Sequence, residues 1–238
     1  MQKKKTAIVT GGSSGMGLSI SQKLKQLGIN VIVFDIQPPP VEFEFAFFHV
    51  DIREDRQIQN ALSQIETIDI LVNNAGVYFE KYLEDTTNDE IDKMVDINIK
   101  GTYLVTRNAF NKIKEAKGSI VIIASCLGLV PELTSPLYCT TKAGLIMLTK
   151  CLAQQYADMG VRVNCVLPGP IDTPLLRKSF SNPEAELHCA NRIPMKRIGR
   201  PEDIANMVAF LVSEDANYIT GGAFPVDGGV SSSSMYSK

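Results

Sequence analysis

The stretch Thr10-Gly11-Gly12-Ser13-Ser14-Gly15-Met16-Gly17 decides the fold, because it joins an apolar run at residues 6–10 to an amphipathic stretch at residues 17–27. Glycines permit a tight turn and a close approach of the backbone to a ligand. The amino end of the following helix offers free N–H groups suited to a pyrophosphate. The stretch predicts a phosphate-binding turn, with a plain structural turn as the alternative, since its spacing is not Gly-x-Gly-x-x-Gly.

Apolar runs and amphipathic stretches alternate along the rest of the chain. We expect strands at residues 6–10, 31–35, 46–50, 68–73, 119–125, 161–167 and 223–226. Helical patterns cover residues 17–27, 55–65, 89–114, 140–159 and 201–213. This alternation predicts a Rossmann-type α/β fold, with one doubly wound parallel sheet of about seven strands and helices on both faces.

Domain organisation follows from the lack of a repeat or an interdomain linker. We expect one catalytic domain at residues 1–230, a substrate lid at about 173–198, and a polar, flexible tail at 231–238. A capping box at Thr87-x-x-Glu90 predicts the start of the long helix at 89–114.

Composition excludes several classes of function. Hydrophobic residues make up 45% and charged residues 21% of the 238 residues, as in ordinary globular proteins. A net charge of -2 gives no footprint for nucleic acid or an anionic membrane. The basic start at Lys3-Lys4-Lys5 is followed by too short an apolar run for a secretory signal. We expect a cytoplasmic protein without nucleic-acid or membrane partners.

The five cysteines and two histidines are widely spaced. This spacing predicts no metal site and no disulfide framework, but reduced and mostly buried thiols.

A rival interpretation of the glycine turn is the Gly-x-Ser-x-Gly nucleophile elbow of α/β-hydrolases, with Ser13 as nucleophile. An elbow needs earlier strands that supply an oxyanion hole, and the sequence shows none before residue 6. It also needs a late histidine, and His188 alone qualifies. The hydrolase is therefore the weaker hypothesis.

Asp35 ends the second predicted strand, about twenty residues beyond the glycine turn, where a carboxylate accepts hydrogen bonds from an adenosine ribose. The same carboxylate would repel a 2′-phosphate. The turn carries Ser13 and Ser14, and Ile36-Gln37 follows Asp35, so no basic residue is present to bind such a phosphate. The sequence therefore predicts NAD as cofactor rather than NADP.

Tyr138 and Lys142 lie four residues apart in Tyr138-Cys139-Thr140-Thr141-Lys142, hence on one face of a helix. A cation within about 4–6 Å lowers the pKa of a phenol, so Lys142 is expected to lower that of Tyr138. Ser125 ends the strand at 119–125, at the edge where parallel sheets bind ligands. We expect Ser125 and Tyr138 to meet one substrate oxygen, although the tyrosine–lysine spacing alone also fits a surface pair.

With these residues the chain resembles the short-chain dehydrogenase/reductase family over roughly residues 5–230. The motifs that carry the resemblance are Thr10-Gly11-x-x-x-Gly15-Met16-Gly17, Asn73-Asn74-Ala75-Gly76, Asn98, Ser125, Tyr138 with Lys142, Pro168-Gly169-Pro170-Ile171-Asp172-Thr173, Arg200-Pro201-Glu202-Asp203-Ile204-Ala205, Ile219-Thr220-Gly221 and Val226-Asp227-Gly228-Gly229.

The resemblance implies a catalytic set of four residues. Tyr138 would deprotonate the substrate hydroxyl as hydride leaves for the nicotinamide, and Ser125 would polarise the substrate oxygen. Lys142 would bind the nicotinamide ribose and lower the tyrosine pKa, and Asn98 would hold a water in a proton relay. Asn98 as a helix-distorting core residue stays open as an alternative.

The resemblance also implies the residues that contact the cofactor. These are Gly11, Ser14, Gly15, Met16, Gly17, Asp35, Asp51, Ile52, Asn74, Tyr138, Lys142, Ile171 and Thr173. Asp51 and Ile52 would contact the adenine, and Ile171 and Thr173 the nicotinamide amide. Asp51 as a helix cap is the alternative for that residue.

We therefore expect an NAD-dependent oxidoreductase that moves a hydride between NAD(H) and the carbinol or carbonyl carbon of a small, partly apolar alcohol or ketone. The alternatives are a reductase of 3-oxoacyl thioesters on carrier protein or CoA, and a non-catalytic dinucleotide-binding sensor or scaffold.

Basic residues in the lid would either favour an anionic substrate or form a solvated face: Arg177, Lys178, Arg192, Lys196 and Arg197. The resemblance further implies a homotetramer or dimer, in which the helices at 89–114 and 140–159 pack against their mates.

Overall fold

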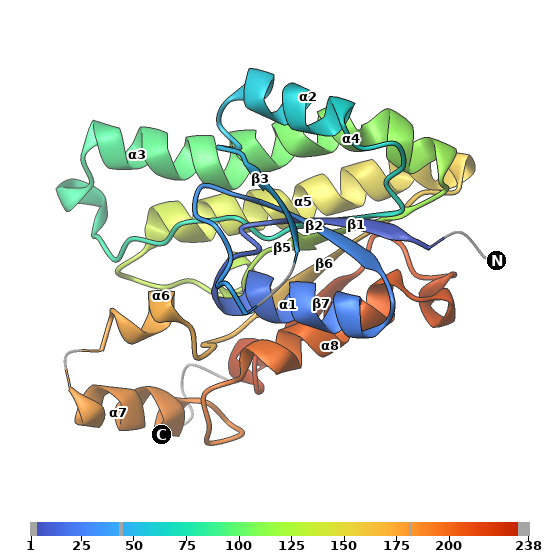
Figure 1. Cartoon of the computed structure of the whole chain (residues 1–238). Helices are drawn as coiled ribbons and strands as arrows, with labels where there is room; N and C mark the ends of the chain where they lie inside the picture. Colours follow the sequence, from blue (N-terminus) through green and yellow to red (C-terminus); the bar gives the residue numbers. More distant parts are fainter. Residues whose placement is uncertain (1–3, 43–44, 181, 233–238) are drawn as a thin grey trace.

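A seven-stranded parallel sheet forms the centre of the computed structural model, which describes residues 4–42, 45–180 and 182–232 (Figure 1). Its strands are β1 (Thr6–Thr10), β2 (Asn30–Asp35), β3 (Ala46–His49), β4 (Ile70–Asn73), β5 (Ser119–Ile123), β6 (Arg162–Pro168) and β7 (Ala223–Val226). They lie in the order β3-β2-β1-β4-β5-β6-β7, and every neighbouring pair is parallel. The predicted fold class is confirmed.

Helices cover both faces of this sheet (Figure 1). On one face lie α2 (Asp55–Ser63), α4 (Thr102–Glu115) and α5 (Pro136–Tyr156), and on the other lie α1 (Gly15–Gln26) and α8 (Pro201–Val212). The remaining helices are α3 (Asn88–Val95), α6 (Pro174–Arg177) and α7 (Pro183–Arg192). Short 3-10 helices are η1 (Leu83–Asp85), η3 (Cys126–Gly128), η4 (Ala157–Met159), η5 (Glu214–Ala216) and η6 (Val230–Ser232).

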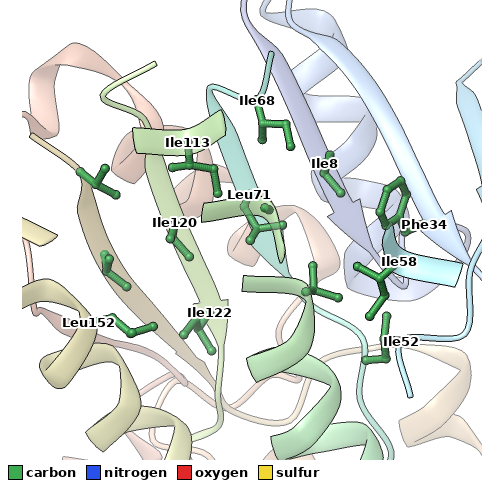
Figure 2. Packing of buried hydrophobic residues seen from close by; sticks show 14 of the residues in the cluster. Ile8, Phe34, Ile52, Ile58, Ile68, Leu71, Ile113, Ile120, Ile122 and Leu152 are labelled. Carbon is green, nitrogen blue, oxygen red and sulfur yellow. The ribbon is translucent and has the colours of Figure 1, made fainter. Parts of the chain in front are cut away.

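Burial on both faces explains why the central strands are continuously apolar. All the residues of β1, β4 and β5 are buried. Figure 2 shows one of the two core clusters, in which Ile8, Ile120 and Ile122 from the sheet meet Ile58 and Leu152 from the helices. Each such side chain contributes about 1.5–3 kcal/mol by its removal from water. The core therefore lies on both sides of β1, β4 and β5, and it holds their carboxyl ends in place.

The helix predicted at 89–114 is helical throughout but changes type in the middle. The capping box of Thr87 and Glu90 opens α3 as expected, but residues Asp96–Gly101 form a π-helical segment, η2, before α4 begins. The buried Asn98 side chain bonds the backbone of Val77 outside the helix, a contact that the widened π turn accommodates. The predicted helical span is confirmed, and the tertiary contact of Asn98 coincides with its departure from the α-helical period.

The helix predicted at 140–159 begins earlier, at Pro136. Proline is favoured at the first helical position because its missing N–H would have no partner there. Tyr138 and Lys142 therefore lie on the same helix, in its first two turns.

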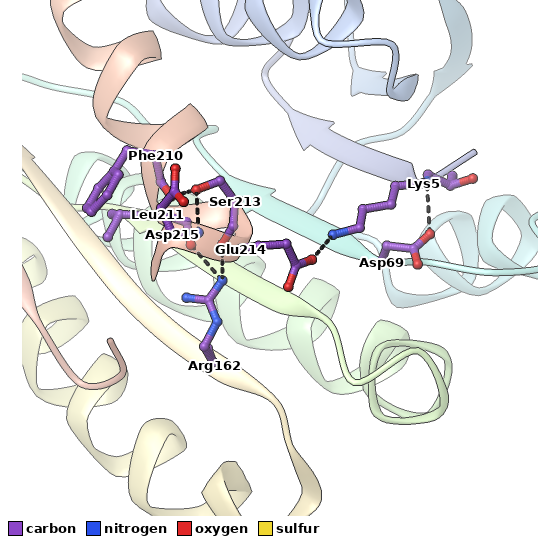
Figure 3. A network of polar contacts seen from close by, with 9 residues as sticks. Lys5, Asp69, Arg162, Phe210, Leu211, Ser213, Glu214 and Asp215 are labelled. Carbon is purple, nitrogen blue, oxygen red and sulfur yellow. Dashed lines mark hydrogen bonds and ion pairs between the residues drawn. The ribbon is translucent and has the colours of Figure 1, made fainter. Parts of the chain in front are cut away.

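The amino ends of the strands are tied to the end of α8 by a polar network (Figure 3). Arg162 at the start of β6 donates to the carbonyls of Leu211, Ser213 and Ile219 at 2.8, 3.4 and 3.2 Å. Partial burial lowers the pKa of Arg162. Lys5 pairs with Glu214 at 2.6 Å. This network links β1 and β6 to the end of α8 at the edge of the sheet that lies opposite the carboxyl ends.

The segment predicted as a lid contains α6 and α7. Its first residue, Thr173, lies against the glycine turn, because a Cβ placed on Gly15 would be 3.3 Å from the Thr173 Cγ2 atom. Ser231 and Ser232 of the predicted tail belong to η6, where the Ser231 N–H bonds Asp227. The tail residues 233–238 and the first residues of the basic start, 1–3, lie outside the described residues. Among the described residues, no helix is long and apolar enough to cross a bilayer.

Candidate active site

The glycine turn between β1 and α1 forms a backbone cradle. Gly11 and Gly15 have φ values of 61° and 51°, in the left-handed region that favours glycine. A Cβ on Gly17 would lie 2.0 Å from the Gly11 carbonyl oxygen, so only glycine fits there. The capping residue Ser14 makes no side-chain hydrogen bond to α1, which leaves the first N–H groups of α1 without a side-chain cap. The turn thus fits a pyrophosphate.

Asn74 braces this turn from the end of β4. Its Nδ2 atom donates to the carbonyls of Thr10 and Gly11, both at 3.0 Å. In return, the Thr10 hydroxyl accepts the backbone N–H groups of Asn74 and Ala75 at 3.0 and 3.1 Å. The glycine motif and the Asn73-Asn74-Ala75-Gly76 motif therefore interlock, and Asn74 shapes the cradle through protein contacts.

Asp35 lies at the rim of the cradle, at the end of β2. Its carboxylate accepts the Ser13 N–H at 3.0 Å and the Gln37 N–H at 3.1 Å. These bonds fix the carboxylate beside the turn, and each oxygen keeps a lone pair for a further donor. No lysine or arginine is among the residues from Gly11 to Gly17 or directly after Asp35.

Asp51 and Ile52 follow β3. The Asp51 carboxylate pairs with Arg53 at 2.5 Å, and Arg53 holds the pKa of Asp51 below its ordinary value. The N-cap of α2 is Glu54, so the alternative of Asp51 as the cap of that helix is wrong. Ile52 is buried and packs close to Gly101 in η2.

The remaining predicted cofactor contacts come from two other elements. Met16 packs against the core cluster beneath α1. Ile171 is buried and bridges to Gly199, and the Thr173 hydroxyl accepts the Leu176 N–H to cap α6. Thr173 also lies next to Gly15 of the glycine turn. The segment after β6 therefore reaches the cradle.

Ser125, Tyr138 and Lys142 meet at the carboxyl end of β5. The Ser125 hydroxyl faces the Tyr138 phenol, whose pKa it acts to lower, and accepts the Leu127 N–H at 3.2 Å. The Lys142 Nζ atom lies 5.4 Å from the centre of the Tyr138 ring and donates to the Ile123 carbonyl at 3.0 Å. The structure therefore brings together the three residues that the sequence analysis singled out as catalytic candidates.

Burial controls the protonation of this group. It lowers the pKa of Lys142 to about 8 and raises the pKa of Tyr138, and the nearby Ser125 hydroxyl opposes the rise at Tyr138. Without a bound cofactor, Lys142 does not lower the pKa of Tyr138 as expected. Burial removes water from both groups, and the Lys142 ammonium donates a hydrogen bond to the Ile123 carbonyl.

The Lys142 shift predicts a stability window. Because its pKa is lower in the folded chain (about 8) than in the unfolded chain (about 10.4), the unfolded chain binds more protons between these values. The free energy of unfolding should therefore gain on the order of 2 kcal/mol from this group as pH rises from 8 to 10. Urea unfolding of the cofactor-free protein measures the slope. A Lys142→Met variant should lack this gain, and an identical slope in both proteins would refute the assignment.

Asn98 is fully buried in η2 and joins two parts of the site. Its Oδ1 atom accepts the Val77 N–H at 2.8 Å, and its Nδ2 donates to the Val77 carbonyl at 3.0 Å and to the Thr141 hydroxyl at 3.2 Å. Both amide hydrogens are therefore used within the protein. Asn98 thus has the buried place in a distorted helix that the alternative describes, and a relay water would have to use its main chain or the remaining lone pair of Oδ1.

Tyr78 was missed by the sequence reasoning. Its ring meets the ring of Tyr138 edge to face, with the centroids 4.9 Å apart, and its hydroxyl accepts from Ser135. The available signal was an aromatic residue two positions after the Asn73-Asn74-Ala75-Gly76 motif.

The hydrolase hypothesis fails on geometry. The Ser13 side chain is buried and its hydroxyl donates to the Gln37 carbonyl at 2.6 Å. His188 lies exposed on α7, and no bond joins it to Ser13 among the described residues. Ser13 therefore shapes the turn.

Two of the basic lid residues are neutralised by carboxylates. Arg177 pairs with Asp172 at 2.5 Å, and Arg197 pairs with Asp203 at 2.8 Å. These exposed pairs fit the solvated face that was the alternative to an anion site.

The cysteines are free, as expected, but not mostly buried: Cys126 and Cys165 are buried, Cys139 and Cys189 are partly buried, and Cys151 is exposed. Within the described ranges, no cluster of metal-ligating side chains occurs.

Comparisons with known proteins place the whole chain among oxidoreductases. A family model described as enoyl-(acyl carrier protein) reductase matches residues 11–231. The 3-oxoacyl-[acyl-carrier-protein] reductase FabG of Rickettsia bellii is 35% identical, with 94% of this chain and 96% of that protein covered. The ligand-free aldohexose dehydrogenase of Thermoplasma acidophilum is similar in structure, with a TM-score of 0.94, 33% identity, and 99% and 97% of the two chains covered.

Two further similar structures hold different cofactors. The 3-ketoacyl-(acyl-carrier-protein) reductase of Brucella melitensis is complexed with NADH, with a TM-score of 0.88, 32% identity, and 95% and 98% of the chains covered. ElxO has NADP bound, with a TM-score of 0.89, 31% identity, and 97% and 100% covered.

Proposed function

Because the chain belongs to the short-chain dehydrogenase/reductase family, we propose that it transfers a hydride between NAD(H) and the carbinol or carbonyl carbon of a small, partly apolar alcohol or ketone. One observation carries the proposal. Ser125, Tyr138 and Lys142 converge at the carboxyl end of β5, in the same sheet whose first turn forms a pyrophosphate cradle.

Proton transfer is the task of the side chains at this site. When bound, the nicotinamide supplies the hydride acceptor or donor. In oxidation, the Tyr138 phenolate oxygen takes the proton of the substrate hydroxyl while the Ser125 hydroxyl bonds the same oxygen. Lys142, with a pKa of about 8, exchanges protons near neutral pH and binds the nicotinamide ribose. In reduction, the phenol of Tyr138 returns the proton.

Asp35 is proposed to select NAD over NADP. Its carboxylate accepts hydrogen bonds from free ribose hydroxyls and repels a 2′-phosphate, and it is held at the rim of the cradle by Ser13 and Gln37.

An Asp35→Ala variant should relax this preference. We expect the ratio of kcat/KM for NAD to that for NADP to fall by about 10–100-fold, which corresponds to the loss of about 1.4–2.7 kcal/mol of charge repulsion. Initial rates with the two cofactors measure the ratio. Asp55→Ala, which removes a carboxylate from α2, is the control. Equal efficiency with both cofactors in the unmutated enzyme would contradict the proposal.

Reduction of 3-oxoacyl thioesters is the second candidate, favoured by the likeness to the Rickettsia and Brucella reductases. Part of the charge near the site disfavours an acidic carrier. The carboxylates of Glu80 and Glu132 act on Tyr78, next to Tyr138, and Arg177 and Arg197 are already paired.

A two-part assay separates these functions. NADH formation is followed across a panel of secondary alcohols and polyols with NAD, and acetoacetyl-CoA reduction is followed with NADPH and NADH. The proposal expects turnover with NAD and at least one neutral alcohol. Turnover of the thioester alone would select the second candidate, and NADH binding without any turnover would favour a non-catalytic sensor.

A homo-oligomer is also proposed. The helices α4 and α5 lie side by side (Figure 1) and expose Tyr103 (53%) and Met147 (58%), apolar area that a second copy can bury. Sedimentation should give a dimer or tetramer that Met147→Asp dissociates, whereas a monomer at every concentration would contradict this.

A further inference from the structure

Tyr78 lies on the loop after β4 and contacts the tyrosine assigned to proton transfer. The two rings meet edge to face, with centroids 4.9 Å apart and an interplanar angle of 80°. This arrangement places the positive edge of one ring against the negative face of the other and is favoured for aromatic pairs. Contact with Tyr78 therefore restricts the orientation of the Tyr138 ring.

A closed circuit of contacts fixes this pair. Val77, the residue before Tyr78, bonds Asn98 through both its N–H and its carbonyl. Asn98 donates to the Thr141 hydroxyl, which donates to the Tyr138 carbonyl at 2.8 Å. The ring contact between Tyr138 and Tyr78 closes the circuit. The backbone of both tyrosines is thus held through one buried amide.

Ser135 anchors the far end of Tyr78. Its hydroxyl donates to the Tyr78 hydroxyl at 3.1 Å, and the Ser135 side chain is buried directly before α5 begins. Because α5 also carries Tyr138, this bond ties Tyr78 to the helix that it contacts. Burial raises the pKa of Tyr78, and the charges of Glu80 and Glu132 act in the same direction. Tyr78 therefore stays protonated and does not compete with Tyr138 for the transferred proton.

We propose that Tyr78, anchored by Ser135, is a positioning residue that holds the Tyr138 ring with its hydroxyl toward Ser125 and shields one side of that ring from water. This inference rests on the proposed function, in which Tyr138 transfers the proton. Tyr78 needs no contact with the substrate to act in this way.

Tyr78→Ala is the main test. Loss of the ring leaves Tyr138 free to rotate, and we expect kcat to fall by about 10–100-fold, as misplaced catalytic groups do, while KM for NAD changes less than about twofold. Water that enters the space relieves the desolvation that raises the pKa of Tyr138. Since oxidation needs the phenolate, the rising limb of the pH profile should move down by about one unit. The other titratable groups that face Tyr138 are Lys142, Cys126 and Cys139, and all are unchanged.

Tyr78→Phe separates the ring from its anchor. Because this variant keeps the ring contact, the rising limb of its pH profile should lie where it does in the unmutated enzyme. Its kcat should be lower than that of the unmutated enzyme by only about two- to fivefold. Ser135→Ala should give the same loss, and the double variant should be no worse than either, because both changes remove one hydrogen bond. Additive losses would contradict the anchoring role.

Tyr82→Ala is the matched control, since Tyr82 lies on the same loop and is 51% exposed. It should change neither kcat nor the limb. The pKa of Tyr138 can also be measured without turnover, by NMR of tyrosine labelled at Cζ with ¹³C in the NADH complex, with the signal assigned by Tyr138→Phe. An unchanged titration in Tyr78→Ala would overturn the inference. Absence of turnover in the unmutated enzyme would instead overturn the proposed function.

Discussion

Replacing Tyr138 by phenylalanine is expected to lower kcat/KM for alcohol oxidation by about 10³-fold, because the phenol oxygen is the group that takes the substrate proton. The ring, its contact with Tyr78 and its place in α5 are kept, so the fold and cofactor binding should not change. Steady-state rates with NAD, together with an NADH binding titration, measure both effects.

The control for this variant is Tyr103→Phe, which removes a phenol oxygen from the exposed face of α4. It should leave kcat/KM unchanged. Activity of Tyr138→Phe within tenfold of the unmutated enzyme would mean that another group transfers the proton.

A methyl group on Gly17 is expected to raise the Kd for NADH by at least about 100-fold. The added Cβ would lie 2.0 Å from the Gly11 carbonyl oxygen, so the backbone must move, and the cradle that offers its N–H groups to the pyrophosphate is lost. Quenching of NADH fluorescence measures Kd for Gly17→Ala, and a thermal melt reports how far the fold is weakened.

Gly28→Ala serves as the comparison, since it also alters a glycine next to α1. Gly28 has a φ of 80°, and nothing lies within 4 Å of an added Cβ. It should lower stability by about 1 kcal/mol through backbone strain and leave NADH binding intact. Equal losses of binding in both variants would show that the effect arises from destabilisation and not from the cradle.

The order of strands and helices could be predicted because buried parallel strands leave a continuous apolar run. β5 shows this most clearly, since all five of its residues are buried. The candidate catalytic residues could be proposed because their order along the chain matches a family pattern. The first inference depends on local runs of sequence, and the second on short motifs in a fixed order.

Features that depend on distant contacts could not be predicted in this way. The π-helical segment at Asp96–Gly101 exists because Asn98 bonds Val77, a contact between residues that no periodicity links. Spacing placed Lys142 near Tyr138 but gave no measure of the burial that shifts both pKa values. Tyr78 followed a recognised motif, yet only the fold shows that its ring meets Tyr138.

Direct transfer of hydride from the substrate to NAD can be followed with an isotope label. A secondary alcohol that is turned over, deuterated at its carbinol carbon, is incubated with the enzyme and NAD, and the product is analysed by mass spectrometry and NMR. We expect NADH with one deuterium at C4 of the nicotinamide, formed at a rate that Tyr138→Phe lowers by about 10³-fold. Product NADH without deuterium, or no NADH from any alcohol at a protein concentration that binds NAD fully, would contradict it.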